Sequence, residues 1–150
     1  MAETNTHDEL LTVALQDLRA GEDLLVERLP AISAAATDVE LVAEITAIVE
    51  AARDRSLALR QTGRGKGGAP NIWMAGVLDD ATRDTQSTAA GPVLDVALVG
   101  AVRKGAAAAL VSYETAMALS EGALNAMLTA CRDAHRASDQ RLAGVLARLA

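Results

Sequence analysis

Residues 10–32 read LLTVALQDLRAGEDLLVERLPAI, and this stretch decides the fold. Its apolar residues recur in steps of three and four, which is the spacing of one buried face of an α-helix. A single charged residue, Glu22, interrupts the stripe near its middle. The stretch therefore predicts a long helix, over residues 8–36, that carries a carboxylate into a helical core. The full stripe is Leu11, Leu15, Leu18, Glu22, Leu25, Leu29 and Ile32.

Two further stretches repeat this pattern, each with a polar residue set into its apolar stripe. Arg55 occupies the stripe of a second helix that ends near Gln61, and His135 occupies the stripe of the last helix. A buried charge is costly unless it is paired, so the three polar residues need a shared explanation. We predict that Arg55 neutralises Glu22 in a buried ion pair and that His135 is a hydrogen-bonded core residue.

Capping and turn residues mark the remaining boundaries. Thr37 and Glu40 predict a capping box in front of the second helix. The glycine-rich segment 62–70 predicts a mobile basic loop. Asn71 can cap a short helix that ends near Thr85.

Pro92 suits the first position of a third long helix, which runs to about Ser120, and Gly122 separates it from the last one. The sequence thus predicts one all-α domain over residues 1–150, with a flexible N-terminus at residues 1–8. We expect a four-helix bundle with a short crossover helix between its second and third long helices.

Composition and charge narrow the class of protein. Of the 150 residues, 51% are hydrophobic but only 1% aromatic, and the formal net charge is -6. An acidic chain has no general attraction for nucleic acid or anionic membranes. Cys131 is the only cysteine, so no internal disulfide can form, which suits a reducing compartment. We expect a cytoplasmic protein without a nucleic-acid or membrane partner.

The third long helix is apolar on almost every side from Val93 to Val102. A helix of that kind is buried on more than one side, and in a bundle this small the second buried side predicts a subunit contact. We therefore expect a homodimer. The candidate contact residues are Val93, Leu94, Val96, Ala97, Leu98 and Val99.

Four-helix bundles often hold two metal ions in the core. Such a site needs inward carboxylates from two helices and Glu-x-x-His pairs from the other two. Here the core positions offer Glu22, the cation Arg55 and His135, whereas the third long helix offers Ala106 and Ala109. This residue set predicts no metal, no other cofactor and no catalytic residue.

Several segments together resemble the YciE/YciF-type bacterial ferritin-like proteins, from about Leu10 to Leu149. Tyr113 lies at the position matching the middle of that family's third helix. The other matching segments are 15–22 (LQDLRAGE), Leu29-Pro30, 34–37 (AAAT), 95–99 (DVALV) and 138–142 (SDQRL).

The resemblance implies a ferritin-like bundle, usually dimeric and linked to bacterial stress responses. Of the family's inward metal ligands, it carries over Glu22 alone. Arg55 stands where the family has a histidine, and Ala106 and Ala109 stand where it has a Glu/His cluster. In the last helix, His135 and its neighbour Ala134 replace a glutamate pair. Glu22, Arg55 and His135 are then interpreted as the buried polar relic of a metal site.

These observations favour a non-catalytic structural or interaction protein, connected to stress, over two alternatives. One alternative is a di-metal oxidase or peroxide-handling protein that keeps metal around Glu22 and His135. The other is a small-molecule binder with a core cavity lined by the alanines of residues 106–109.

Overall fold

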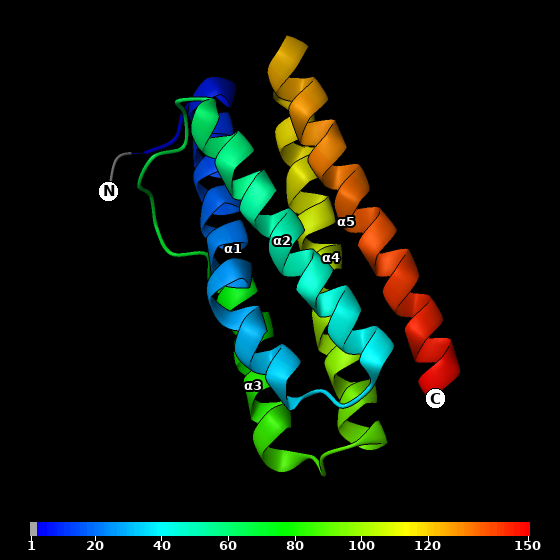
Figure 1. Ribbon diagram of the computed structural model, residues 1–150. Coiled ribbons are helices and arrows are strands. Elements are labelled where there is room, and N and C mark those ends of the chain that lie inside the picture. The colour runs from blue at the N-terminus through cyan, green and yellow to red at the C-terminus, as the bar shows by residue number, and fades with distance from the viewer. Residues whose placement is uncertain (1–2) are drawn as a thin grey trace.

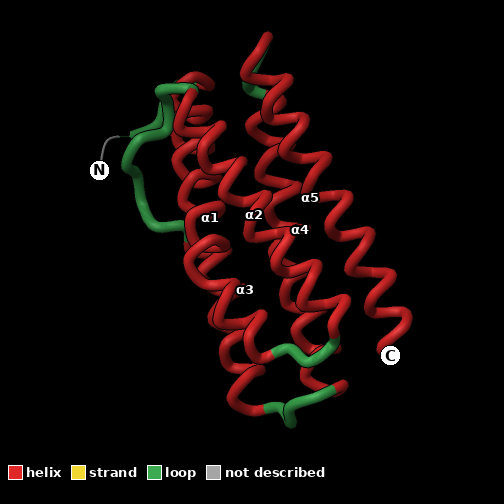
Figure 2. The backbone as a smooth tube through the Cα atoms, in the orientation of Figure 1, coloured by secondary structure: helices red, strands yellow, loops and turns green. Residues whose placement is uncertain are grey.

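The computed structural model describes residues 3–150, and helices account for most of them (Figures 1 and 2). Four long helices and one short helix follow in chain order, as the apolar spacing predicts. The described residues contain no strand. The helices are α1 (His7–Ala35), α2 (Val39–Gln61), α3 (Ile72–Ser87), α4 (Pro92–Ala118) and α5 (Gly122–Leu149).

The long helices form two antiparallel hairpins, α1 with α2 and α4 with α5 (Figure 1). The connection between the hairpins runs back along α1 and includes α3, so α2 and α4 point the same way. One long crossover of this kind is typical of ferritin-like bundles. The α3 helix lies against α1 and α4 at one end of the bundle (Figure 1).

The core divides into two apolar clusters, one at each end of the bundle. One cluster lies at the α3 end and contains most of the buried isoleucine and valine. The other lies toward the α4–α5 turn and contains Tyr113 and Cys131. Between them, the stripe positions of the long helices hold the polar residues Glu22, Arg55 and His135, all of them buried. The fold thus places these residues where the four long helices meet.

The predicted capping box at Thr37 is wrong. Asp38 is the N-cap of α2, and its side chain accepts a hydrogen bond from the backbone N–H of Leu41. Thr37 instead donates through its backbone N–H and its hydroxyl to the carboxylate of Asp95, at 2.8 and 2.7 Å. A buried acceptor from α4 outcompetes the local cap, because it satisfies two donors that would otherwise be orphaned.

The glycine-rich segment lies along α1 instead of standing away from the bundle. Gln16 donates a hydrogen bond to the carbonyl of Lys66, and Arg19 donates one to the carbonyl of Arg64. Gly65 has a φ of +71°, and a Cβ atom there would lie 2.9 Å from the backbone of Leu15. Glycine is therefore required at this position, both for the backbone conformation and for the close approach to α1.

Asn71 and Pro92 confirm the other two boundary predictions. The Asn71 side chain caps α3 by accepting from the Met74 N–H at 2.8 Å, and it also donates to the Asp17 carbonyl of α1 at 2.9 Å. Pro92 is the first residue of α4. Among the described residues, no helix has the length and hydrophobicity needed to cross a bilayer.

Candidate functional site

A buried polar cluster lies at the centre of the bundle, with one residue from each long helix. Glu22 of α1 accepts three hydrogen bonds on its Oε1 atom. The donors are Arg55 Nε of α2 at 2.8 Å, Tyr113 Oη of α4 at 2.8 Å and His135 Nε2 of α5 at 2.7 Å. The structure therefore contains the predicted Glu22–Arg55 ion pair, and it brings His135 onto the same carboxylate oxygen.

The helical register explains why these four side chains converge. Each stands on the inward stripe of its helix, with buried residues three or four positions before and after it. Tyr113 is fully buried, and the exposed fractions of Glu22, His135 and Arg55 are 2%, 3% and 6%. Long side chains on a helix lean toward its N-terminus, which carries the Tyr113 hydroxyl down from its own turn toward Glu22.

Glu22 is ionised at neutral pH in this environment. Burial alone would raise the pKa of its carboxyl group. The hydrogen bond and charge of His135, with the charge and hydrogen bond of Arg55, outweigh burial and hold that pKa below its ordinary value. An ionised carboxylate only accepts hydrogen bonds, so His135 donates through a protonated Nε2.

Tyr113 and Cys131 lie near this carboxylate, and neither side chain is ionised at neutral pH. Burial, followed by the negative charge of Glu22, raises the pKa of the Tyr113 hydroxyl well above its ordinary value. The same two causes, in the same order, raise the pKa of the Cys131 thiol. Both groups are therefore protonated at neutral pH, and a protonated buried thiol is a poor nucleophile. The Cys131 sulfur lies 3.7 Å from the Met127 sulfur, which it contacts one helical turn away.

The residues of this cluster do not fit a di-metal centre. Among the described residues, no group of three or more His, Cys, Asp and Glu side chains is placed to hold a metal ion. Glu22 and His135 are in direct hydrogen-bonding contact, and the Arg55 guanidinium occupies the position beside them. The α4 helix contributes Tyr113 at this level, and its adjacent inward positions are alanine. The cluster is a hydrogen-bonded ion pair that satisfies its own charge.

The run of alanines at residues 106–109 begins beside the crossover helix α3. Ala106 and Ala109 are buried, whereas Ala107 is exposed. Beside them, the sulfur of Met74 on α3 lies 3.5 Å from the point where a Cβ on Gly105 would be. The cavity lined by Gly105 measures about 10 Å³, far below the roughly 300 Å³ of a typical small-molecule site. The crossover helix therefore fills the space beside this part of α4.

The predicted contact residues on α4 divide into two groups. Leu94, Leu98 and Val99 are at most 2% exposed within the single chain. The prediction that they form a dimer contact is therefore wrong. Val96 and Ala97 are half-buried, and Val93 is 65% exposed. The error has a physical cause: α4 packs on α1, α3 and α5 of its own chain, which accounts for most of its apolar circumference.

Sequence reasoning missed two buried polar contacts. Tyr113 is a central donor to Glu22. Its position on the inward stripe of α4 was the available signal. Asp95 is 2% exposed and accepts from Thr37 and from the backbone N–H of Asp38. No local pattern identifies these partners, because they lie 57 and 58 residues away along the chain.

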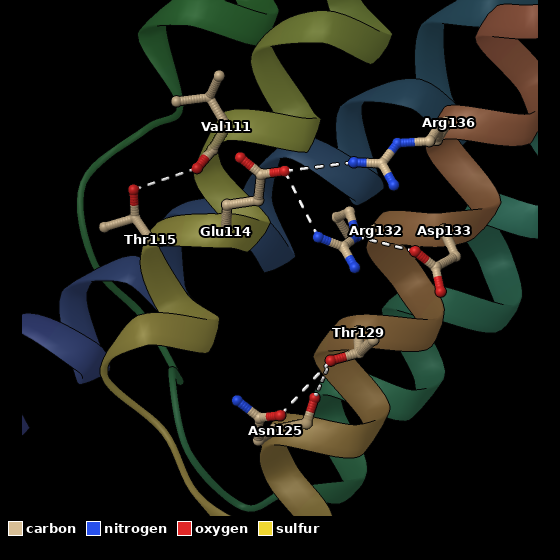
Figure 3. A network of polar contacts seen from close by, with 8 residues as sticks. All are labelled: Val111, Glu114, Thr115, Asn125, Thr129, Arg132, Asp133 and Arg136. Carbon is tan, nitrogen blue, oxygen red and sulfur yellow. Dashed lines mark hydrogen bonds and ion pairs between the residues drawn. The ribbon is translucent and has the colours of Figure 1, made fainter.

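The outward faces of α4 and α5 carry a separate polar network (Figure 3). Glu114 of α4 accepts from Arg132 and Arg136 of α5, each at 3.5 Å, and Arg132 also pairs with Asp133 at 2.8 Å. These charges balance, and solvent-exposed pairs contribute little to stability. The network joins two helices at the surface and offers no convergent site.

Solved structures of other proteins share this helical architecture. No protein-family model and no curated protein matches the sequence, but solved structures do match. One, described as the E. coli stress protein YciF, superposes with a TM-score of 0.91 at 20% identity, covering 97% of this chain and 98% of that chain. This chain has the YciF fold.

A second structure supports the same assignment. It is described as YcfI, a putative structural protein from Rhodopseudomonas palustris, and it matches with a TM-score of 0.86 at 22% identity. The match covers 92% of this chain and 93% of that chain. The resemblance stated from sequence motifs is thus confirmed at the level of the fold, over nearly the whole chain.

Proposed function

We propose that this chain is a non-catalytic structural protein with a YciF fold that has lost its di-metal site. The observation that carries the proposal is the Arg55 guanidinium, which binds Glu22 at 2.8 Å in the core. A guanidinium supplies a permanent positive charge, so the carboxylate needs no metal to be neutralised. The low exposure of all four cluster residues also denies a substrate any access to them.

A role in stress is part of the proposal. It is supported by the stress protein among the structural matches, and the second match is described as a putative structural protein. The sole cysteine is a buried free thiol, which suits a reducing compartment such as the cytoplasm. The similar structures support a role in stress by analogy of fold, and the free thiol is compatible with the cytoplasm.

Metal analysis tests the loss of the metal site. Protein purified without chelators should contain no stoichiometric iron, manganese or zinc by plasma mass spectrometry, and titration with each ion should add none to the core. The Glu22→Gln variant is the control, because it removes the only inward carboxylate of the cluster. Finding about two ions per chain in the wild type, and their loss in this variant, would overturn the proposal.

We also propose that the protein is a homodimer, through a different face from the one that the sequence indicated. The α3 helix lies against only one end of the two longer helices α1 and α4 (Figure 1). Beyond it, two hollows of about 180 and 140 Å³ lie side by side and share Ala14 and Asp17. The apolar side chains that rim them are 41–61% exposed: Leu10, Val13 and Val111.

This face contains both projecting side chains and hollows, as a two-fold interface requires. Light scattering at micromolar concentration should give the mass of a dimer, and Val111→Lys should convert it to a monomer. Val93→Lys tests the contact predicted from sequence, and Leu57→Lys on α2 is a control of similar exposure; neither should change the mass. A monomeric wild type, or dissociation by Val93→Lys, contradicts the proposed interface.

A further inference from the structure

Two charged atoms at the centre of the bundle have no hydrogen-bond partner among the described residues. They are Oε2 of Glu22 and Nη1 of Arg55, and both atoms are buried. Their side chains are more than nine-tenths buried. The other carboxylate oxygen of Glu22 is shared by three donors, so the hydrogen bonding around this carboxylate is strongly one-sided.

The two atoms have opposite requirements. An ionised carboxylate oxygen needs a donor, whereas a guanidinium nitrogen needs an acceptor. A simple ion of either sign would therefore attract one of the two atoms and repel the other. The group that meets both needs at no charge cost is an uncharged molecule that donates and accepts through O–H bonds, and water is the smallest such molecule.

Two small side chains lie on the inward stripes of α2 and α4 beside this level of the core. Ala52 lies on α2 one turn before Arg55, and Ala109 lies on α4 one turn before Tyr113; both are almost fully buried. A methyl side chain can form no hydrogen bond with either of the two unpartnered atoms. Alanine at these two positions therefore adds neither a competing hydrogen bond nor a bulky side chain beside the two atoms.

We propose that this centre is a binding site for internal water. Water donates a hydrogen bond to Oε2 of Glu22 and accepts one from Nη1 of Arg55, as a fixed constituent of the folded protein. The bundle centre then consists of the Glu22–Arg55 ion pair and the buried water that is hydrogen-bonded to it.

Magnetic relaxation dispersion of water oxygen-17 tests this site, because it counts water molecules that stay bound for longer than the protein takes to tumble. The wild type should show at least one such water molecule per chain. The double variant Glu22→Leu/Arg55→Met removes both unpartnered atoms and should lose that signal. Ala107→Leu, at an exposed position of α4, is the matched control and should keep it.

A wild type without long-lived water, or a double variant with an undiminished signal, would overturn the proposal. If circular dichroism shows that the double variant does not fold, a high-resolution crystal structure of the wild type decides the question. Solvent density at hydrogen-bonding distance from Glu22 Oε2 and from Arg55 Nη1 supports the site. A dry contact around both atoms refutes it.

Discussion

At the residue scale, the Glu22 carboxylate joins the four long helices at the centre of the bundle through its hydrogen bonds. Its three hydrogen-bonding neighbours are donors from the other three long helices, and all three bind one of its oxygen atoms. Removing a single donor measures what that contact contributes, because the other two remain.

Tyr113→Phe removes one donor and leaves the ring that packs against the core. A hydrogen bond to a charged group contributes roughly 1.5–3 kcal/mol, so we expect the free energy of unfolding to fall by about that amount in urea melts. Trp73, the only tryptophan, reports unfolding in both proteins by fluorescence. An unchanged stability would show that the Tyr113–Glu22 hydrogen bond does not contribute to folding.

The pH dependence of stability follows from the lowered pKa of Glu22. A carboxyl group whose pKa is lower in the folded state than in the unfolded state binds fewer protons when folded. Its contribution is complete above the unfolded pKa, about 4.3, and is lost as the pH falls through the lower folded value.

We therefore expect the wild type to lose its stability advantage over Glu22→Gln as the pH is lowered from neutrality to below that range. Urea melts of both proteins at a series of pH values measure this difference. The variant corrects for the other carboxylates with lowered pKa values, such as Asp38, which both proteins share. A stability gap that stays constant with pH would contradict the assignment.

At the element scale, Asp95 anchors the first turn of α4 to the connection between α1 and α2. Its carboxylate accepts from both backbone N–H groups of the Thr37–Asp38 pair and from the Thr37 hydroxyl. Asp38 in turn caps α2 and pairs with Arg148 of α5 at 2.6 Å. One buried residue thus ties the ends of four helices together.

Asp95→Ala should remove the acceptor of two partly buried backbone N–H groups as well as of the Thr37 hydroxyl. A hydrogen bond to a charged group contributes roughly 1.5–3 kcal/mol, so the variant should be destabilised by more than Thr37→Val, which removes the hydroxyl donor alone. Thermal melts by circular dichroism provide the comparison. Equal losses for the two variants would mean that the backbone N–H groups find other partners.

Sequence periodicity predicts the elements well, because each long helix except α4 has one clear apolar stripe. The structure confirms the stripes of α1, α2 and α5, including the burial of Glu22, Arg55 and His135. The α4 helix is different: an apolar surface on every side gives no preferred inward direction, so its contacts with α3 could not be separated from a subunit contact. The missed role of Asp95 has a similar cause, since its partner is distant in sequence.

At the scale of the whole molecule, the fold and the candidate site stand on different evidence. The YciF fold follows from helix order, the single crossover and the superposition over 97% of the chain. The site follows from the geometry of this chain alone. Glu22 and Arg55 could be paired from their matching stripe positions, whereas the convergence of Tyr113 and His135 on one oxygen depends on helix rotation, which spacing does not specify.

The coupling free energy between Glu22 and Arg55 tests the central claim most directly, namely that an ion pair organises the bundle centre. It is obtained from urea unfolding of the wild type, Glu22→Leu, Arg55→Met and the double variant. Each single variant leaves an uncompensated buried group and should lose roughly 3–5 kcal/mol. The double variant should lose much less than the two losses combined. Single variants that are harmless, or losses that simply add, would contradict the account.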